Sequence, residues 1–233
     1  WLDSKMILQN RNQEMLSEIV LYLNPTLEIY SLKEADSDVS YHRDLQVIIL
    51  ERQLLPDDSI SLHISYKGKI DEAICYLDVP FEERHNVGRY DPGMRRGLFN
   101  FGTRFAYLEE NYTLLHPEVL WYPVAVPPVN MVSPYAREIN FTEYTLRVKT
   151  WEGQQVLSQG VPEYGTGEVS FKNRQKLSGI TLCIGDYHKK EIEFGGLQLE
   201  FYYFPGHELF FEGYTEIQGE KLSKVLTLSL IHI

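Results

Sequence analysis

The chain has 233 residues, of which 43% are hydrophobic and 13% are aromatic, so it can bury a full core as one large β domain or two small ones. Its formal net charge of −11 argues against nucleic acids and anionic membrane surfaces as main partners, because both repel an acidic protein. No run of about 18 apolar residues occurs and no signal peptide is visible, so the sequence predicts no membrane-spanning helix.

The first third of the chain is typical of a β domain. Residues 1–15 are polar and mixed, and they predict a short helix or an extended lead-in. From there on, β-branched and aromatic runs separated by turn residues predict strands. These strands are expected at residues 18–23, 27–30, 45–50, 60–66 and 70–78. The run 60–66 alternates strictly, which places Ile60, Leu62 and Ile64 on a buried face and Ser61, His63 and Ser65 on a polar one.

Prolines, glycines and charges at residues 80–100 interrupt this pattern and predict a long loop, which is solvated or, less favoured, binds an anion through its arginines. Further short strands follow, with a tight hairpin turn at residues 151–153, whose return strand is 155–158, and a second hairpin turn at 195–196. The strands are expected at residues 101–108, 112–115, 141–148, 155–158, 165–171, 177–184, 192–194 and 197–203. Apolar residues then recur at helical spacing, which predicts a short C-terminal helix.

Together these signals predict an all-β fold, an antiparallel β-sandwich or saddle of about a dozen short strands with a short C-terminal helix. We divide the chain into a lead-in at 1–15, a β-sandwich domain at 16–213, a helical linker at 214–227 and a tail at 228–233. The tail resembles a translated sequencing-adapter sequence, although a natural apolar tail is the alternative. The chain also begins at Trp1 without an initiator methionine, so we expect it to be a fragment of a longer open reading frame.

The mid-chain segment LLHPEVLWYP, residues 114–123, is the feature around which the two β-rich halves are arranged. Its Trp-Tyr pair supplies a large apolar surface with two polar groups. Pro117 and Pro123 fix backbone angles and remove donors, so we predict a rigid corner instead of a strand of a ladder. A corner that packs the core is the favoured interpretation. The alternative is the rim of a substrate cleft, with Glu118, Trp121 and Tyr122 as the candidate residues.

Motifs for catalysis or metal binding are not complete in this sequence. His207-Glu208 begins the H-E-x-x-H pattern of zinc proteases, but Phe211 stands where the second histidine ligand belongs. No G-x-S-x-G, Walker or G-x-G-x-x-G pattern occurs. Cys75 and Cys183 each lie in an apolar run and are expected to be buried thiols, with a single disulfide left open. We therefore predict no catalytic and no metal-binding residue in this chain.

Several separated stretches together resemble one protein family. They are NP at 24–25, YHRDL at 41–45, LLPDDS at 54–59, ICYLD at 74–78, the corner at 114–123, LSQG at 157–160 and SGITLCIG at 178–185. The family is the bacterial membrane protein in which an ABC-transporter-permease-like part is fused to an aminopeptidase N-like zinc metallopeptidase region. The resemblance covers roughly residues 16–226.

The resemblance implies that this chain is the β-rich domain that precedes a catalytic domain, packs on it and helps to wall its cleft. Zinc would then bind only in that catalytic domain, whose motifs are not in this sequence. The implied partners are this downstream domain and a peptide substrate, and the parent would be membrane-associated, with this domain soluble and more often extracytoplasmic. Related soluble enzymes carry F-P-C-x-D-E-P, whereas here Tyr122-Pro123-Val124 stands in the comparable place without the acidic pair.

Two other functions stay open at the level of sequence. One is a stand-alone module that binds carbohydrate or protein, because the chain has 16 Tyr, 11 Phe and 3 Trp; solvent-facing rings would favour it and buried rings would not. The other is the ectodomain of a transporter whose peptidase region has lost catalysis. Either way we expect this chain alone to have no enzymatic activity.

Overall fold

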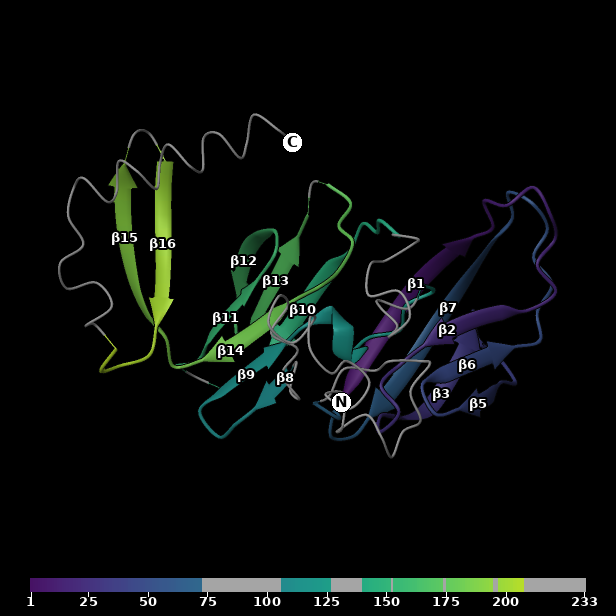
Figure 1. The fold of residues 1–233 in the computed structure, drawn as a ribbon, viewed down its shortest axis with the longest axis horizontal. Coiled ribbons are helices and arrows are strands. Elements are labelled where there is room, and N and C mark those ends of the chain that lie inside the picture. The colour runs from purple at the N-terminus through teal and green to yellow at the C-terminus, as the bar shows by residue number, and fades with distance from the viewer. Residues whose placement is uncertain (73–105, 127–139, 152, 174, 195–196, 208–233) are drawn as a thin grey trace, which may run out of the picture.

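A computed structural model describes residues 1–72, 106–126, 140–151, 153–173, 175–194 and 197–207 (Figure 1). These residues form antiparallel strands and one short 3-10 turn, so the predicted all-β class is confirmed. The two β-rich halves lie side by side along the longest axis of the molecule, with the 3-10 turn between them (Figure 1).

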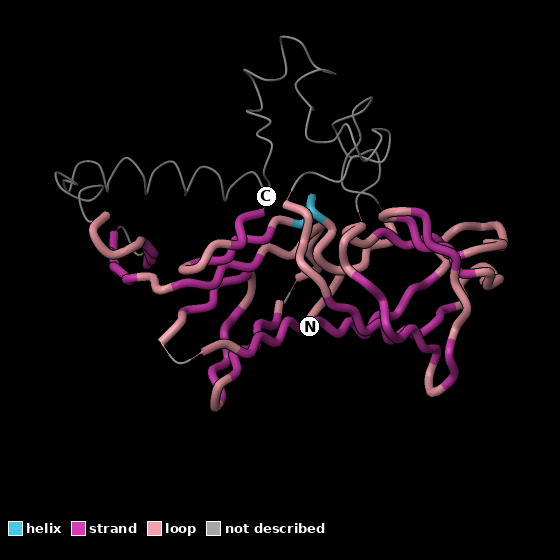
Figure 2. The backbone as a smooth tube through the Cα atoms, turned by 90° about the horizontal axis from the view of Figure 1, so that it is seen from below, coloured by secondary structure: helices cyan, strands magenta, loops and turns pink. Residues whose placement is uncertain are grey.

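The N-terminal half contains two sheets. Its strands are β1 (Leu2–Gln9), β2 (Ile19–Tyr22), β3 (Glu28–Glu34), β4 (Ser37–Asp38), β5 (His42–Asp44), β6 (Val47–Leu50) and β7 (Ser59–Lys67). One sheet has the order β1-β7-β3-β4 and the other has the order β2-β6-β5. Seen from below, the strands of this half form two layers (Figure 2). Apolar side chains from both sheets, such as Leu21, Ile48 and Leu62, are buried in one core cluster, because each strand alternates its side chains between the two faces.

The C-terminal half contains three sheets. Its elements are β8 (Ala106–Leu108), β9 (Tyr112–Leu115), the 3-10 turn η2 (Pro117–Val119), β10 (Thr145–Lys149), β11 (Gln155–Ser158), β12 (Val161–Gly165), β13 (Glu168–Lys172), β14 (Leu182–Gly185), β15 (His188–Phe194) and β16 (Leu197–Tyr203). The sheets have the orders β11-β14-β9-β8, β10-β13-β12 and β15-β16. The β15–β16 hairpin lies at the far end of the molecule from the N-terminal half (Figure 1). The core cluster continues into this half through Val148, Val156, Phe171 and Leu182.

Two local predictions are wrong, and one of two alternatives is excluded. The strands on either side of residues 151–153 are not hairpin partners, because β10 pairs with β13 and β11 pairs with β14. Of the two alternatives for the first residues, the helix is excluded, because β1 is a full strand that pairs with β7 from Leu2–Tyr66 to Gln9–Ser59. Its alternation is obscured in the sequence because Ser4 takes an inward position, where its hydroxyl lies 3.0 Å from Tyr66 Oη, while Ile7 points outward and is exposed. Residues 165–171 are not one strand, because Gly167 with φ of +69° helps turn the chain between β12 and β13.

The alternation predicted for residues 60–66 is confirmed for Ile60, Leu62 and Ile64, which are buried. Ser65 differs because it is also buried, and its hydroxyl donates a hydrogen bond to Asp3 on the adjacent strand β1. The predicted helical linker at 214–227, the tail at 228–233, the loop at 80–100 and Cys75 lie outside the described residues.

Candidate functional site at the Trp121 corner

The corner is a single tight turn of backbone. His116 is extended, Pro117–Val119 form η2, and Leu120 adopts the left-handed conformation with φ of 54° and ψ of 43°. The Leu120 N–H donates to Pro117 O at 2.9 Å, which closes the turn. Val119 and Leu120 are fully buried, so the turn is part of the core as well as a change of direction. The segment is therefore a corner, as the sequence predicts, with Pro117 at the first position of its 3-10 turn.

Asn24 attaches the corner to the N-terminal half. Its side chain is completely buried, and its Nδ2 donates to Val119 O at 2.7 Å and to Asp71 O at 2.9 Å. The Asn24 backbone N–H donates to Leu120 O at 2.8 Å. Its Oδ1 in turn accepts from the Thr26 hydroxyl at 2.7 Å and from the Asp71 N–H at 3.1 Å. One amide side chain thus joins three stretches of chain that are far apart in sequence.

Trp121 and Tyr122 attach the corner to the C-terminal half through the backbone of one residue, Ile180. The indole Nε1–H donates to Ile180 O at 3.1 Å, and the Ile180 N–H donates to Tyr122 Oη at 2.9 Å. The two rings contact edge to face, with centroids 4.9 Å apart at 78°. Neighbouring Gly179 lies so close to the corner that an added Cβ would lie 2.8 Å from Pro117 Cγ. Glycine is therefore required here for close approach.

The segment around Ile180 is also held from its other side. The Thr181 N–H donates to Gln159 Oε1 at 3.0 Å, and the Ser158 hydroxyl donates to Thr181 O at 2.7 Å. Residues from 24–25, 114–123, 157–160 and 178–185 therefore meet in one place. These are four of the stretches on which the family resemblance was based, so the structure gives them a shared role at the junction between the halves.

The three candidate residues differ in accessibility. Trp121 is only 3% exposed, so its indole packs inside this chain, while Tyr122 and Glu118 are half-buried. Burial raises the pKa of the Tyr122 hydroxyl to about 12, and the hydrogen bond from the Ile180 N–H only partly offsets it. Oε2 of Glu118 is buried and makes no hydrogen bond with the described residues. Glu118 is thus the member of the corner with a carboxylate oxygen that no described group pairs.

The corner brings together hydrogen-bonding and packing groups, not a nucleophile with a base. Among the described residues, no three His, Cys, Asp or Glu side chains gather where they could hold a metal ion, so this part of the chain does not fit a zinc site. Cys183 is a free, half-buried thiol, and burial raises its pKa, which disfavours the reactive thiolate. No helix in the described ranges is long and apolar enough to cross a membrane.

Sequence reasoning missed Asn24 as a site residue and noted it only as part of a turn signal. The available clue was a polar residue directly after a buried strand and before a proline, where a side-chain amide often satisfies nearby backbone groups. Its partner Val119 is 95 positions away, however, and nothing local indicates that pairing.

The fold is similar to that of solved zinc metallopeptidases. A mutant two-domain M1 zinc metallopeptidase bound to L-arginine matches with a TM-score of 0.55 and 15% identity over 85% of this chain and 41% of that one. The M1 zinc metallopeptidase from Deinococcus radiodurans matches with a TM-score of 0.54 and 14% identity over 89% of this chain and 46% of that one. This chain therefore spans less than half the length of these enzymes, and the similarity shows the fold alone.

A scan of protein-family models and a sequence search of curated proteins returned no match.

Proposed function

We propose that this chain is the non-catalytic β domain of a longer, aminopeptidase N-like zinc metallopeptidase, and that it packs on the catalytic domain and walls its peptide cleft. The observation that carries the proposal is the fold match, in which nearly the whole of this chain corresponds to less than half of an M1 metallopeptidase. Zinc and the hydrolysis of peptides belong, in this proposal, to the rest of the protein.

The finer form of the proposal is a fusion to an ABC-transporter-permease-like membrane part, with this domain outside the cytoplasm. Its support is the set of sequence stretches that resemble that family, four of which meet at the Trp121 corner. A corner held by Asn24 on one side and Ile180 on the other is a rigid support, because both halves are fixed to the same turn. Such a support suits a domain that keeps a cleft wall in place.

Glu118 is the proposed contact of the corner with the catalytic domain. The Glu118 side chain is half-buried, so its accessible part could accept from a cationic or N–H donor of the next domain. Its buried Oε2 has no hydrogen bond with the described residues, which is unfavourable for a charged group. Glu118→Gln removes the charge and keeps the shape. In the 233-residue chain this change leaves the melting temperature unchanged or raises it, since no described group donates to that oxygen.

The experiment compares the 233-residue chain with the protein extended by the coding sequence that follows it in the native gene. We expect the extended protein to contain H-E-x-x-H and to hydrolyse aminoacyl reporter substrates only with zinc, while the shorter chain has no activity with or without zinc. In the extended protein, Glu118→Gln should lower the melting temperature, and Glu14→Gln, at an exposed position in the N-terminal half, is the matched control.

Two results would overturn the proposal: zinc-dependent turnover by the 233-residue chain, or a native gene with no peptidase domain after it. An extended protein with a disrupted zinc motif and no turnover would instead support the ectodomain of a transporter. If Glu118→Gln and Glu14→Gln change the melting temperature of the extended protein equally, Glu118 is not the contact with the catalytic domain.

A further inference from the structure

Two hollows flank Tyr112 at the end of the β11-β14-β9-β8 sheet. The first has a volume of about 270 Å³ and lies between the turn after β8 and the turn after β10. The second has a volume of about 400 Å³ and is lined by Asn111, Asp186, Phe204 and Pro205. Tyr112 lines both. Neither hollow includes a residue of the Trp121 corner, so they constitute a separate feature of the molecule.

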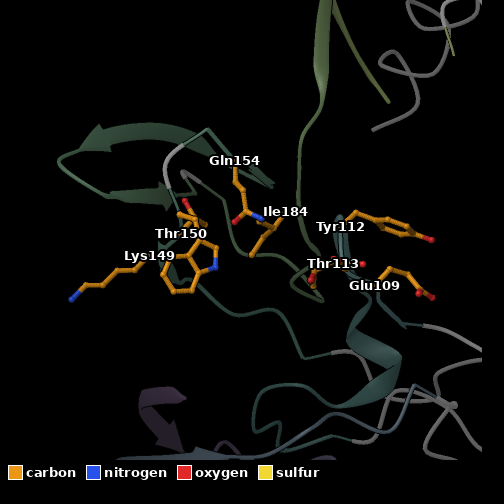
Figure 3. Close-up of a pocket in the computed structure, with 9 residues that line it drawn as sticks. Glu109, Tyr112, Thr113, Lys149, Thr150, Gln154 and Ile184 are labelled. Atoms are coloured by element: carbon orange, nitrogen blue, oxygen red, sulfur yellow. The ribbon is translucent and has the colours of Figure 1, made fainter. Parts of the chain in front are cut away.

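The first hollow has an exposed aromatic wall. Trp151 lines it and is 82% exposed, although an indole of this size is usually buried. Figure 3 shows Gln154 beside Ile184, with Tyr112 and Glu109 on the opposite side of the hollow from Lys149. The Lys149 side chain extends away from the other labelled residues (Figure 3). The Trp151 indole and the Gln154 amide therefore line this space, whereas the Lys149 ammonium, the Glu109 carboxylate and the Tyr112 ring extend away from it (Figure 3).

The second hollow has an aromatic floor. The centroids of the Tyr112 and Phe204 rings lie 5.1 Å apart, and those of the Phe204 and Tyr187 rings lie 4.8 Å apart. Tyr107 stacks on Tyr112 from another side at 6.4 Å and 29°. The ring of Tyr112 is therefore fixed by aromatic neighbours, so a ligand that packs on it meets a surface that is already ordered. Asn111 and Asp186 add polar groups at the edge of this floor.

We propose that these hollows bind a neutral oligosaccharide, with one sugar ring on Trp151 and the next on the Tyr112–Phe204 surface. The electron-rich face of an aromatic ring attracts the polarised C–H groups of a pyranose, and carboxylate and amide oxygens accept hydrogen bonds from its hydroxyls. A hollow of 270 Å³ is at the small end for ligand sites, which fits one sugar ring rather than a large compact ligand.

Charge argues against the anionic alternative. The chain has a net charge of −11, and Glu109 and Glu110 line the first hollow, so a phosphorylated or uronic-acid ligand would be repelled. A neutral polyhydroxyl ligand experiences no such repulsion, and the Gln154 amide in the first hollow and Asn111 and Asp186 in the second offer it polar groups. This inference does not depend on the proposed peptidase role, because no residue of the corner at 114–123 lines either hollow.

The test is titration of the 233-residue chain with cellohexaose and maltohexaose, followed by tryptophan fluorescence and calorimetry. We expect saturable binding of at least one of them with a change in tryptophan emission. Trp151→Ala should weaken binding by about tenfold or more, the effect of losing roughly 1.4 kcal/mol of aromatic contact. Trp1→Ala is the matched control, because Trp1 is 83% exposed but contacts Tyr30 and lies in the other half of the chain.

Asn111 lies at an exposed position of the second hollow, and Asn111→Ala should weaken the binding of the hexasaccharides more than that of the corresponding disaccharides. The proposal is overturned if neither hexasaccharide binds at millimolar concentration while circular dichroism shows folded protein. It is also overturned if Trp1→Ala lowers affinity as much as Trp151→Ala does. Binding of hexalysine or polygalacturonate in place of the neutral sugars would refute the neutral ligand class.

Discussion

Replacing Asn24 by alanine should be among the most damaging single changes at the junction. The amide donates to Val119 O, which is fully buried, so its loss leaves that carbonyl without this donor at a cost of about 1–3 kcal/mol. The bond to Asp71 O is partly buried, where water can substitute, and it adds about 1 kcal/mol. The Asp71 N–H also donates to the Thr26 hydroxyl at 3.0 Å, so losing Asn24 Oδ1 as its other acceptor adds little to the loss of stability. The expected loss is therefore about 2–4 kcal/mol.

Urea unfolding followed by far-UV circular dichroism measures this loss as a shift of the midpoint. One buried cluster includes residues of both halves, from Ile19 to Leu182, so we expect one cooperative transition. Asn12→Ala is the matched control, because Asn12 is exposed and its side chain holds no part of the corner; it should change stability by no more than about 0.5 kcal/mol. If Asn24→Ala and Asn12→Ala unfold at the same midpoint, the junction does not depend on this amide.

Two further predictions concern the other side of the corner. Gly179→Ala should destabilise the chain by about 1–3 kcal/mol in the same urea assay, because the new Cβ would lie 2.8 Å from Pro117 Cγ. Gly165→Ala is the control and should have a much smaller effect, because its Cβ would meet nothing closer than 3.5 Å. In alkali the folded chain should lose stability as pH rises from about 10 toward 12. In the folded chain Tyr122 has a pKa of about 12 and keeps its proton over this range, whereas in the unfolded chain it loses the proton near its ordinary pKa of 10.0. Tyr122→Phe should flatten that part of the stability profile, and an unchanged slope would contradict the assignment.

Local patterns were enough to predict the class of fold, because side-chain alternation and turn residues are properties of neighbouring positions. The strand at residues 60–66 and the β15–β16 hairpin followed directly from them. Strand β1 was left undecided between a helix and an extended segment because Ser4 faces inward and Ile7 faces outward, and only the pairing with β7 accounts for both. A strand whose pattern depends on its neighbour cannot be assigned from its own residues.

The candidate site shows the same limit more sharply. The sequence indicated that Trp121 and Tyr122 lie in a rigid corner, and prolines alone were sufficient for that prediction. The partners of the corner are 59 positions away at Ile180 and 95 positions away at Asn24, so no local signal could reveal them. For the same reason the sequence could not tell that the Trp121 indole packs inside while Glu118 keeps an oxygen without a described donor.

The corner separates two roles that are otherwise difficult to distinguish in a domain of this kind. The Trp121 indole donates to Ile180 and the Asn24 amide donates to Val119, so changes to these groups act on the fold of this chain. Glu118 makes no hydrogen bond through Oε2 with the described residues, so the proposal expects a change there to act mainly on the contact with the catalytic domain. A Glu118 variant that lowers the stability of the extended protein alone would assign Glu118 a contact role. An Asn24 variant that lowers the stability of both proteins would assign Asn24 a supporting role at the same corner.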